Sequence, residues 1–324
     1  MPYIKQLKIG DFVCPSNLVL APMAGITDTP FRILCLKGGA GLVCAEMVSA
    51  SALKFDSPKS IKMLQVDKAE HPLSMQVFGG DAQTIAEACK MAEAQGADII
   101  DINAGCPVKK VNKAGAGCVL MKTPEKIAEI LKAAVKSVKI PVTLKTRVSL
   151  NRTENLAPLL TKIAQDSGAA AITLHARAAA DVHSGPPNLA FLESACRVAQ
   201  IPVIANGGVI NAEDAKNLFE TGAQAVMIGR GAIGNPFIFT EISNILSSRP
   251  FGKIPNAEKA LMFLTLIEEN VKFYGERTGI SRSKKTVGYW LNGFANAAAV
   301  RERFVRCETI AQAREILSVV TKEN

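Results

Sequence analysis

The sequence contains no pair of cysteines in a C-x-x-C pattern, and no cysteine has a histidine at metal-ligand spacing. These absences argue against zinc or iron–sulfur ligation. No apolar run reaches the roughly 18 residues that a membrane-spanning helix needs. The N-terminal residues also lack the apolar core of a signal peptide. We therefore expect a cytoplasmic protein that binds no metal and no membrane, with eight free thiols that are mostly buried.

The residues that are present form an ordinary globular composition with an excess of positive charge. Of the 324 residues, 48% are hydrophobic and 21% are charged, which is typical of soluble globular chains. The net charge of +9 favours a polyanionic partner. The excess is densest at the C-terminus, where residues 248–324 carry 13 Lys and Arg against 8 Asp and Glu, compared with 25 against 21 in residues 1–247.

Short apolar runs alternate with amphipathic stretches between residue 18 and about residue 230. The runs lie at 18–22, 41–46, 73–79, 98–103, 141–146, 171–176, 202–206 and 225–229. The clearest amphipathic stretches lie at 81–95, 124–137, 155–167 and 211–221. Nearly continuous apolar runs are typical of parallel strands covered by helices. Their number and even spacing predict an α/β fold, a (β/α)8 TIM barrel, over a doubly wound open sheet.

Local signals mark the ends of several predicted helices. Thr123 and Asn211 precede acidic first turns and are predicted N-caps. Gly96, Gly168 and Gly222 each follow a predicted helix, in the position that favours a left-handed backbone.

The C-terminal part has a different pattern. Residues 247–259 contain two prolines and a glycine and are a predicted linker. The stretches 257–275, 283–292 and 309–320 have helical periodicity. We therefore predict a catalytic TIM-barrel domain at 1–247 and a small helical domain at 248–324.

Functional side chains follow almost every predicted strand, at the point where the apolar run ends. Active sites of TIM barrels are built from these strand ends and the loops after them. Buried polar groups need partners, so a full ring of them is hard to explain by packing alone. The positions are Pro22, Met23, Ala24, Glu46, Gln76, Asn103, Cys106, Lys145, Arg147, His175, Arg177, Asn206, Gly229 and Arg230.

Glycine-rich turns follow the last two strands, with ANGGV at 205–209 and IGRGAIGNP at 228–236. In TIM barrels these loops often form a phosphate site. Glycine lets backbone N–H groups approach a phosphate closely, and an arginine adds positive charge. Two tight turns without a ligand are the alternative, but the pattern recurs at both expected strands and favours a phosphate site.

Lys145 ends the fifth strand among apolar neighbours. It could pair with a carboxylate, form a Schiff base as in barrel aldolases, or stabilise negative charge that develops on a flavin ring. Gln76 offers both a donor and an acceptor to the edge of a pyrimidine-like ring. A phosphate site, a cation and amides around one mouth fit flavin mononucleotide (FMN) better than a sugar phosphate.

The segments that carry these residues resemble the tRNA-dihydrouridine synthases, and within them the bacterial branch. The long matches are APMAGITDTPFR at 21–32 and DINAGCPVKKVNKAGAGCVLMKTP at 101–124. Shorter matches are QVFGGD at 76–81, LKTR at 144–147, HAR at 175–177, IPVIANGG at 201–208 and IGRGAIGNPFIF at 228–239. The resemblance implies an FMN enzyme that uses NADPH to reduce specific uridines in tRNA to 5,6-dihydrouridine. The basic helical tail matches the tRNA-binding domain of that family less specifically.

The resemblance also implies roles for individual residues. The implied flavin-ring contacts are Pro22, Met23, Ala24, Gln76, Lys145 and His175, and the implied phosphate contacts are Asn206, Gly207, Gly208, Gly229 and Arg230. Asn103 would contact the flipped uracil, and Cys106 would be the proton donor. Further candidates for substrate or tRNA contact are Arg147 and Arg177 at the mouth, Lys109 after Cys106, and Lys284, Lys285 and Arg301 in the basic tail runs SRSKK and RERFVR.

A thiol suits the role implied for Cys106, although a buried packing cysteine is the ordinary reading of such a residue. When hydride reaches carbon 6 of uracil, the resulting enolate needs a proton at carbon 5. A thiol with a pKa of roughly 8.5 is mostly protonated near pH 7 yet acidic enough to donate. An anionic flavin nearby would raise that pKa further. We therefore predict that Cys106 is a general acid and not a nucleophile.

The chain departs from the family pattern at Ala178-Ala179-Ala180, where a threonine and a second arginine are common. Cys118 stands where the family often has serine or alanine and is predicted to be a packing residue.

Two other functions compete with the family reading. A flavin barrel acting on a free pyrimidine would need no basic tail, and a non-catalytic RNA-binding barrel would need neither Cys106 nor Lys145.

Overall fold

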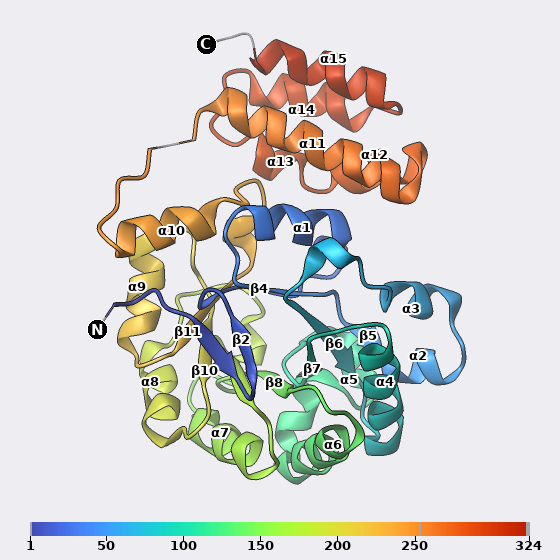
Figure 1. Ribbon diagram of the computed structural model, residues 1–324. Helices are drawn as coiled ribbons and strands as arrows, with labels where there is room; N and C mark the ends of the chain where they lie inside the picture. The colour runs from blue at the N-terminus through green and yellow to red at the C-terminus, as the bar shows by residue number, and fades with distance from the viewer. Residues whose placement is uncertain (1, 253, 322–324) are drawn as a thin grey trace.

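A closed barrel of eight parallel strands forms the centre of the computed structural model, which describes residues 2–252 and 254–321 (Figure 1). Around the barrel the strands are β3 (Leu18–Leu20), β4 (Leu42–Cys44), β6 (Leu73–Phe78), β7 (Ile99–Asn103), β8 (Val142–Arg147), β9 (Ala171–His175), β10 (Val203–Asn206) and β11 (Ala225–Ile228). Pairing of β11 with β3 closes the ring, and the two-residue strand β5 (Val48–Ser49) pairs with the end of β6. The predicted TIM barrel and its eight strands are confirmed.

Both faces of the strands are buried, which explains why the apolar runs are nearly continuous. Leu18 and Leu20 belong to the large core between the sheet and the helices. Val19, which points to the other face, belongs to a second core inside the barrel, with Ile204 and Met227 from other strands.

An antiparallel hairpin closes the N-terminal end of the barrel and was not predicted from the sequence. Its strands β1 (Leu7–Ile9) and β2 (Phe12–Cys14) contribute Leu7, Ile9 and Cys14 to the inner core. Gly10, at the hairpin turn, has a φ of +57° and lies against Pro141, next to the start of β8.

Helices surround the barrel in the order expected for alternating strands and helices. They are α1 (Thr29–Lys37), α2 (Ala50–Lys54), α3 (Pro58–Met63), α4 (Ala82–Ala94), α5 (Lys109–Lys113), α6 (Pro124–Ser137), α7 (Ala157–Asp166), α8 (Leu189–Val198), α9 (Ala212–Glu220) and α10 (Ile238–Leu246). The predicted helices at 81–95, 124–137, 155–167 and 211–221 are confirmed. Gly96, Gly168 and Gly222 each follow their helix with a positive φ, as predicted.

The two predicted N-caps differ. The Asn211 side chain accepts a hydrogen bond from the backbone N–H of Asp214 at 2.9 Å, so it caps α9. Thr123 precedes α6, but its side chain makes no capping hydrogen bond. The prediction of a side-chain cap at Thr123 was therefore wrong. Pro124 at the start of α6 has no N–H to satisfy, which removes one of the groups that a cap would serve.

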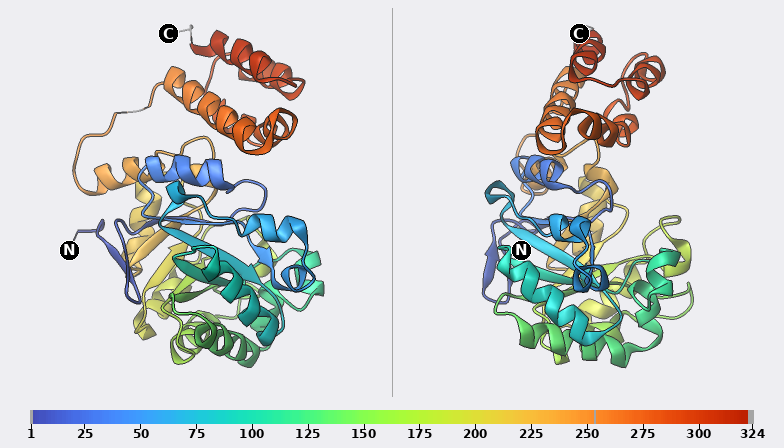
Figure 2. Two further views of the ribbon diagram at one scale, coloured as in Figure 1. Left: turned by 45° about the vertical axis from the view of Figure 1, so that its right-hand side comes forward. Right: turned by 90° about the vertical axis from the view of Figure 1, so that its right-hand side faces the viewer.

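The C-terminal part, here called the helical region, consists of α11 (Asn256–Tyr274), α12 (Glu276–Lys284), α13 (Val287–Trp290), α14 (Ala297–Val305) and α15 (Ile310–Thr321). It lies over α1 in all the views of Figures 1 and 2. Trp290 stacks on Phe263 with ring centroids 5.3 Å apart, and Phe304 lies 5.2 Å from the same ring.

Two predictions for the C-terminal part need correction. The connection after α10 ends at residue 255, because α11 already includes residues 256–259 of the predicted linker. The predicted helix at 283–292 is divided between the last two residues of α12 and α13, and most of α12 and all of α14 were not predicted. Lys253 of the linker and residues 322–324 of the predicted domain lie outside the described residues. The domain boundary after residue 247 stays a prediction.

Candidate active site

The carboxyl ends of the barrel strands open into a cavity of about 1020 Å³. Fifteen residues that the sequence singled out line it together. They are Pro22, Met23, Ala24, Gln76, Asn103, Cys106, Lys145, Arg147, His175, Arg177, Asn206, Gly207, Gly208, Gly229 and Arg230. The cavity therefore gathers every predicted flavin and phosphate contact at one place. Four predicted tRNA contacts, Lys109, Lys284, Lys285 and Arg301, do not line it.

Cys106 is held at the cavity by a chain of hydrogen bonds that begins inside the barrel. The Oδ1 atom of Asn103 accepts the backbone N–H groups of Gly105 and Cys106, at 3.1 and 3.0 Å. Asn103 Nδ2 donates to Gln76 Oε1 at 2.8 Å, and Gln76 Nε2 donates to Asp101 Oδ2 at 2.6 Å. Because each amide is fixed by the next, the position of the thiol depends on the buried carboxyl group of Asp101, at the end of this chain of hydrogen bonds.

The backbone around Cys106 is also packed from the other side. The Cys106 carbonyl accepts the N–H of Cys118 at 3.0 Å. At Gly117, which has a φ of +69°, an added Cβ would lie only 2.5 Å from the same carbonyl oxygen. Only glycine fits this approach. Cys118 itself is buried, in agreement with its predicted packing role.

The Cys106 thiol is half-buried and faces the cavity. Burial raises the pKa of this thiol, which favours the protonated form near neutral pH. Among the eight cysteines, six are buried and only Cys106 and Cys196 are partly exposed. All eight are free thiols, as predicted, and most are buried. Within the described ranges, no group of three or more His, Cys, Asp or Glu side chains could hold a metal ion.

Lys145 extends into the cavity from the end of β8. Its Nζ atom donates to Asn206 Oδ1 at 3.2 Å. Burial lowers the pKa of Lys145 to about 8. Asp101 opposes this shift, because its carboxylate favours the charged lysine. The nearby carboxylate that the sequence left open as a partner is thus Asp101, which interacts with Lys145 without a direct hydrogen bond.

Two histidines meet at the cavity. His175 and His183 have ring centroids 6.0 Å apart in an edge-on arrangement. His175 Nδ1 is buried and has no hydrogen-bond partner in the described part of the chain. Burial, reinforced by the charge of Lys145, lowers the pKa of His175, so its imidazole is neutral. His183 was not predicted as a site residue, because its loop carries no strand-end signal.

Three arginines hold the loop that carries His183 by its carbonyl groups. Arg147 donates to the carbonyls of Ala178 at 3.0 Å and Val182 at 2.8 Å. Arg177 donates to Gly185 O at 2.7 Å, and Arg230 donates to His183 O at 3.2 Å. Arg147 also donates to Gly105 O at 3.0 Å, beside Cys106. Its guanidinium therefore joins the cysteine loop to the histidine loop, in addition to lining the cavity.

The glycine turns after β10 and β11 bring backbone to the cavity beside these cations. Gly207 and Gly208 have φ values of +132° and +83°. An added Cβ at Gly208 would lie 3.4 Å from Arg177 Nη2, and one at Gly207 would lie 3.6 Å from Nη1. Side chains at these turns would fill the space in front of the guanidinium. The arrangement suits an anion that contacts the turn and Arg177 together.

The helical region supplies part of the cavity wall. Lys259, Gly288, Tyr289 and Asn292 line the cavity opposite the barrel loops. Tyr289 is 48% exposed, so its ring is available to a ligand. These residues and Asp101 were not predicted as site residues from the sequence. A carboxyl group in the middle of the apolar run 98–103 was a signal for Asp101, whereas nothing in the local pattern marked Tyr289.

Solved structures share this fold at low sequence identity. An old yellow enzyme homologue from Zymomonas mobilis superimposes with a TM-score of 0.60 and 13% identity, covering 78% of this chain and 94% of that chain. Morphinone reductase in complex with tetrahydroNAD gives a TM-score of 0.55 and 13% identity, covering 79% and 93%. At this identity the likeness concerns the fold alone.

Sequence comparison identifies much nearer relatives. A tRNA-dihydrouridine synthase B from Vibrio parahaemolyticus is 41% identical over 92% of this chain and 93% of its own length. One from Pseudomonas aeruginosa is 39% identical, over 93% and 92%. The family model described as dihydrouridine synthase matches residues 19–324. The resemblance seen in the sequence motifs is confirmed, and the chain is an enzyme that belongs to the dihydrouridine synthase family, with bacterial relatives.

Proposed function

We propose that this enzyme reduces specific uridines of tRNA to 5,6-dihydrouridine, with FMN bound at the barrel mouth, NADPH as the reductant and Cys106 as the proton donor. The observation that carries the proposal is the position of Cys106. Its thiol faces the same cavity as Lys145, His175 and the glycine turns, and it is fixed there by Asn103. The names of the bacterial relatives supply the substrate.

The cavity fits a flavin nucleotide by its chemistry. The glycine turns and the Arg177 and Arg230 guanidinium groups would hold the phosphate. The ring would lie near Pro22, Met23 and Ala24, with Lys145 at its anionic side. The unpartnered Nδ1 of His175 is a buried polar atom that needs a ligand as its partner. The cavity volume of about 1020 Å³ lies at the upper end of ordinary ligand pockets, roughly 300 to 1,000 Å³.

When bound and reduced by NADPH, the flavin would supply a hydride to carbon 6 of the uracil ring. This chain's own residues then complete the reaction. Lys145 would provide positive charge at the anionic side of the flavin ring, where negative charge develops. Cys106 gives its proton to carbon 5, and the C5=C6 double bond becomes a single bond. The thiolate that remains lies near Lys145 and Arg147, whose charges favour it until it takes a proton from solvent.

The amides of Gln76 and Asn103 also make hydrogen bonds within the protein. Both make hydrogen bonds to protein groups, Gln76 to Asp101 and Asn103 to Gln76 and the cysteine loop. The implied contacts to the flavin edge and to uracil stay predictions for both residues. A direct consequence of the observed bonds is that each orients its neighbour.

Replacement of Cys106 by alanine tests the proposal. Cys106→Ala should purify with the same flavin content as the wild-type protein and oxidise NADPH at the same rate without tRNA. It should form dihydrouridine at least about 100-fold more slowly, because general acid catalysis typically contributes that much. Mass spectrometry of nucleosides from treated tRNA measures the product. Cys196→Ala, which removes the other partly exposed thiol, is the matched control.

The outcome separates the alternatives. A wild-type protein without flavin, or with no activity on any tRNA, would overturn the proposed reaction. Full dihydrouridine formation by Cys106→Ala would leave the reaction in place but remove the thiol from it. Reduction of free uracil or orotate in place of tRNA would support the free-pyrimidine alternative.

The cytoplasmic location is part of this proposal. Among the described residues, no helix is long and apolar enough to cross a membrane.

A further inference from the structure

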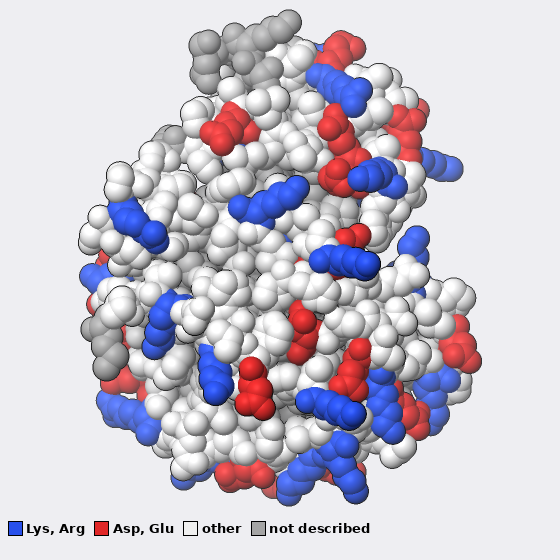
Figure 3. Space-filling model, viewed as in Figure 1, with Lys and Arg blue, Asp and Glu red and all other residues white. Residues whose placement is uncertain are grey.

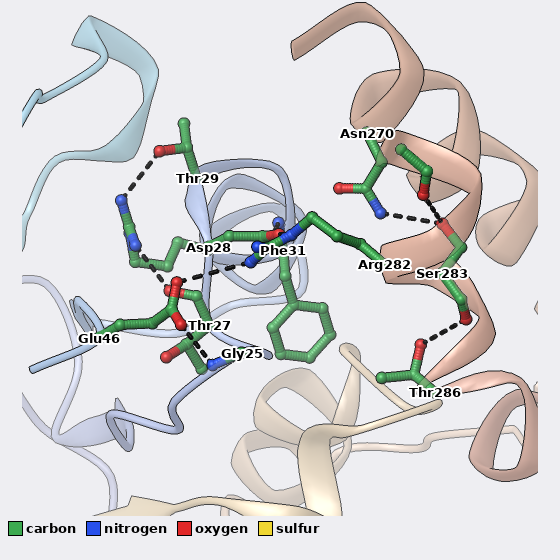
Figure 4. Close-up of polar contacts among 12 residues, drawn as sticks. Gly25, Thr27, Asp28, Thr29, Phe31, Glu46, Asn270, Arg282, Ser283 and Thr286 are labelled. Carbon is green, nitrogen blue, oxygen red and sulfur yellow. Dashed lines mark hydrogen bonds and ion pairs between the residues drawn. The ribbon is translucent and has the colours of Figure 1, made fainter. Parts of the chain in front are cut away.

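A single arginine from the helical region contacts two acidic side chains of the barrel. Arg282 lies on α12, and its Nε atom is 2.7 Å from Asp28 Oδ2. Its Nη2 atom is 3.6 Å from Glu46 Oε2. The guanidinium also lies over the Tyr274 ring, with Cζ 4.5 Å from the ring centroid. Figure 4 shows Arg282 extending from α12 toward the barrel loops.

The contact is largely removed from solvent. Only 21% of the Arg282 side chain, 7% of Asp28 and 17% of Glu46 are exposed. Dissolved salt screens the attraction between such partly buried charges less than it screens the attraction between charges on the surface. A guanidinium is suited to the position because its planar fork can reach two carboxylates and stack on an aromatic ring at once.

Both acidic side chains are tied to the barrel mouth. Asp28 is the N-cap of α1 and accepts the backbone N–H of Phe31 at 3.3 Å. Glu46 follows β4 and accepts the backbone N–H of Gly25 through its Oε1 atom (Figure 4). Gly25 comes directly after Met23 and Ala24, which line the cavity. The sequence placed Glu46 in the ring of mouth residues, but it does not line the cavity and instead joins the mouth loop to Arg282.

On the other side, Arg282 is close in the chain to the residues that complete the cavity wall. Tyr289 follows on α13 and lines the cavity. A second contact lies nearby, because a Cβ added at Gly234, in the loop after β11, would be 2.6 Å from the Tyr289 carbonyl carbon. The wall formed by the helical region is therefore held at two points, one ionic and one of close backbone packing.

We propose that Arg282 is a positioning residue for tRNA reduction, which fixes the helical region and the Pro22–Thr27 loop relative to each other so that both walls of the cavity meet the substrate. The inference rests on the proposed function. Arg282 itself does not line the cavity, and it acts through Glu46 and Gly25 on one wall and through α13 on the other. It also means that one basic residue of the tail run SRSKK has a role inside the protein.

The central experiment compares Arg282→Ala with Arg314→Ala. Arg314 makes the same kind of bridge, to Glu268 at 2.9 Å, but both partners lie within the helical region. Arg282→Ala should lower kcat/KM for tRNA about ten-fold, since a displacement of about 1 Å in positioning groups can cost more than that. NADPH oxidation without tRNA should decrease less than kcat/KM for tRNA, because the wall formed by the helical region meets the tRNA substrate. Arg314→Ala should keep wild-type kcat/KM for tRNA, and Arg282→Lys should be intermediate because it retains charge without the fork.

A second variant separates positioning from a general loss of stability. Without Arg282, Asp28 and Glu46 are left as two carboxylates that lack their counter-ion. Glu46→Gln keeps an oxygen for the Gly25 N–H and removes one of these charges. The double variant Arg282→Ala/Glu46→Gln should therefore recover part of the lost kcat/KM. If Arg282→Ala does not fold, Glu46→Gln alone should show a smaller decrease in the same direction.

Amide hydrogen exchange provides a readout that needs no tRNA. Peptides that cover residues 22–28 should exchange about ten-fold faster in Arg282→Ala than in the wild type, because Gly25 loses a firmly held acceptor. Arg314→Ala should leave these peptides unchanged. Wild-type exchange in Arg282→Ala, or wild-type kcat/KM for tRNA, would overturn the inference. Failure of the wild-type protein to modify tRNA would overturn the proposed function, whereas the exchange result would still report whether Arg282 fixes the loop.

Discussion

Asp101 is a carboxyl group inside the barrel whose ionisation the fold resists. It accepts hydrogen bonds from Gln76 at 2.6 Å and from the Thr143 hydroxyl at 2.7 Å. Burial raises its pKa from 3.8 to about 6, although these hydrogen bonds and Lys145 oppose the shift. Its folded pKa therefore lies above its unfolded pKa. The stability that protonated Asp101 contributes is present below about pH 4 and is lost as the pH rises through about 6.

Asp101→Asn should remove this pH dependence, because an amide does not titrate. The free energy of unfolding of the variant, relative to wild type, should increase by about 3 kcal/mol between about pH 4 and pH 7, given a shift of about two pKa units. Urea unfolding at the two pH values measures the difference, and Asp166→Asn, at an exposed carboxylate, is the control. Equal pH dependence in wild type and Asp101→Asn would contradict the prediction.

Single residues also show what the sequence could and could not predict about the site. The positions of Lys145, His175 and Cys106 follow from the strand-end rule of TIM barrels, because the apolar runs locate those ends closely. The partners of each side chain depend on rotamers and on neighbouring strands. Asn103 was therefore predicted correctly as a mouth residue, but its bonds to Gln76 and to the cysteine loop were not foreseen.

The start of α9 and the start of α6 form a matched pair of helix termini. Asn211 caps α9 by accepting from Asp214, and the Asp214 side chain accepts the N–H of Ile210 at 3.0 Å in return. Thr123 makes no such bond at α6. Asn211→Ala should lower the free energy of unfolding by about 1 kcal/mol, the typical value for a lost N-cap. Thr123→Ala should change it by less than half as much, and a similar loss from both would contradict the assignment of the caps.

Elements of different length were predicted with different success. The helices α4 and α6, with 13 and 14 residues, give several turns of apolar periodicity and were predicted closely. The strands β1 and β2 have three residues each, too few for an alternating pattern to be seen. In the helical region, the break after Lys284 carries no proline or glycine, so the periodic stretch 283–292 appeared as one helix.

Charge is distributed over the whole molecule in a way that composition does not reveal. Figure 3 shows basic and acidic side chains interspersed over one face, with a hollow where the helical region meets the barrel. Much of the tail's positive charge is paired, as in the bridges of Arg303 with Glu315 and Arg306 with Glu302. By contrast, Lys284, Lys285 and Arg301 have no acidic partner within 4 Å among the described residues. These three predicted tRNA contacts are thus cations without an acidic partner in the described part of the chain.

These three residues should dominate the salt dependence of tRNA binding. Each phosphate contact contributes roughly 0.7 to 0.9 to the slope of log K against log salt concentration. Replacement of Lys284, Lys285 and Arg301 together by alanine should make the slope shallower by about 2 and weaken binding at low salt. The control replaces Lys5, Lys8 and Lys139, which are exposed at the N-terminal end of the barrel, and removes the same total charge. Fluorescence anisotropy with labelled tRNA at several salt concentrations measures both. If the two triple variants change the slope equally, the tRNA responds to net charge alone, and the helical region is not its docking surface.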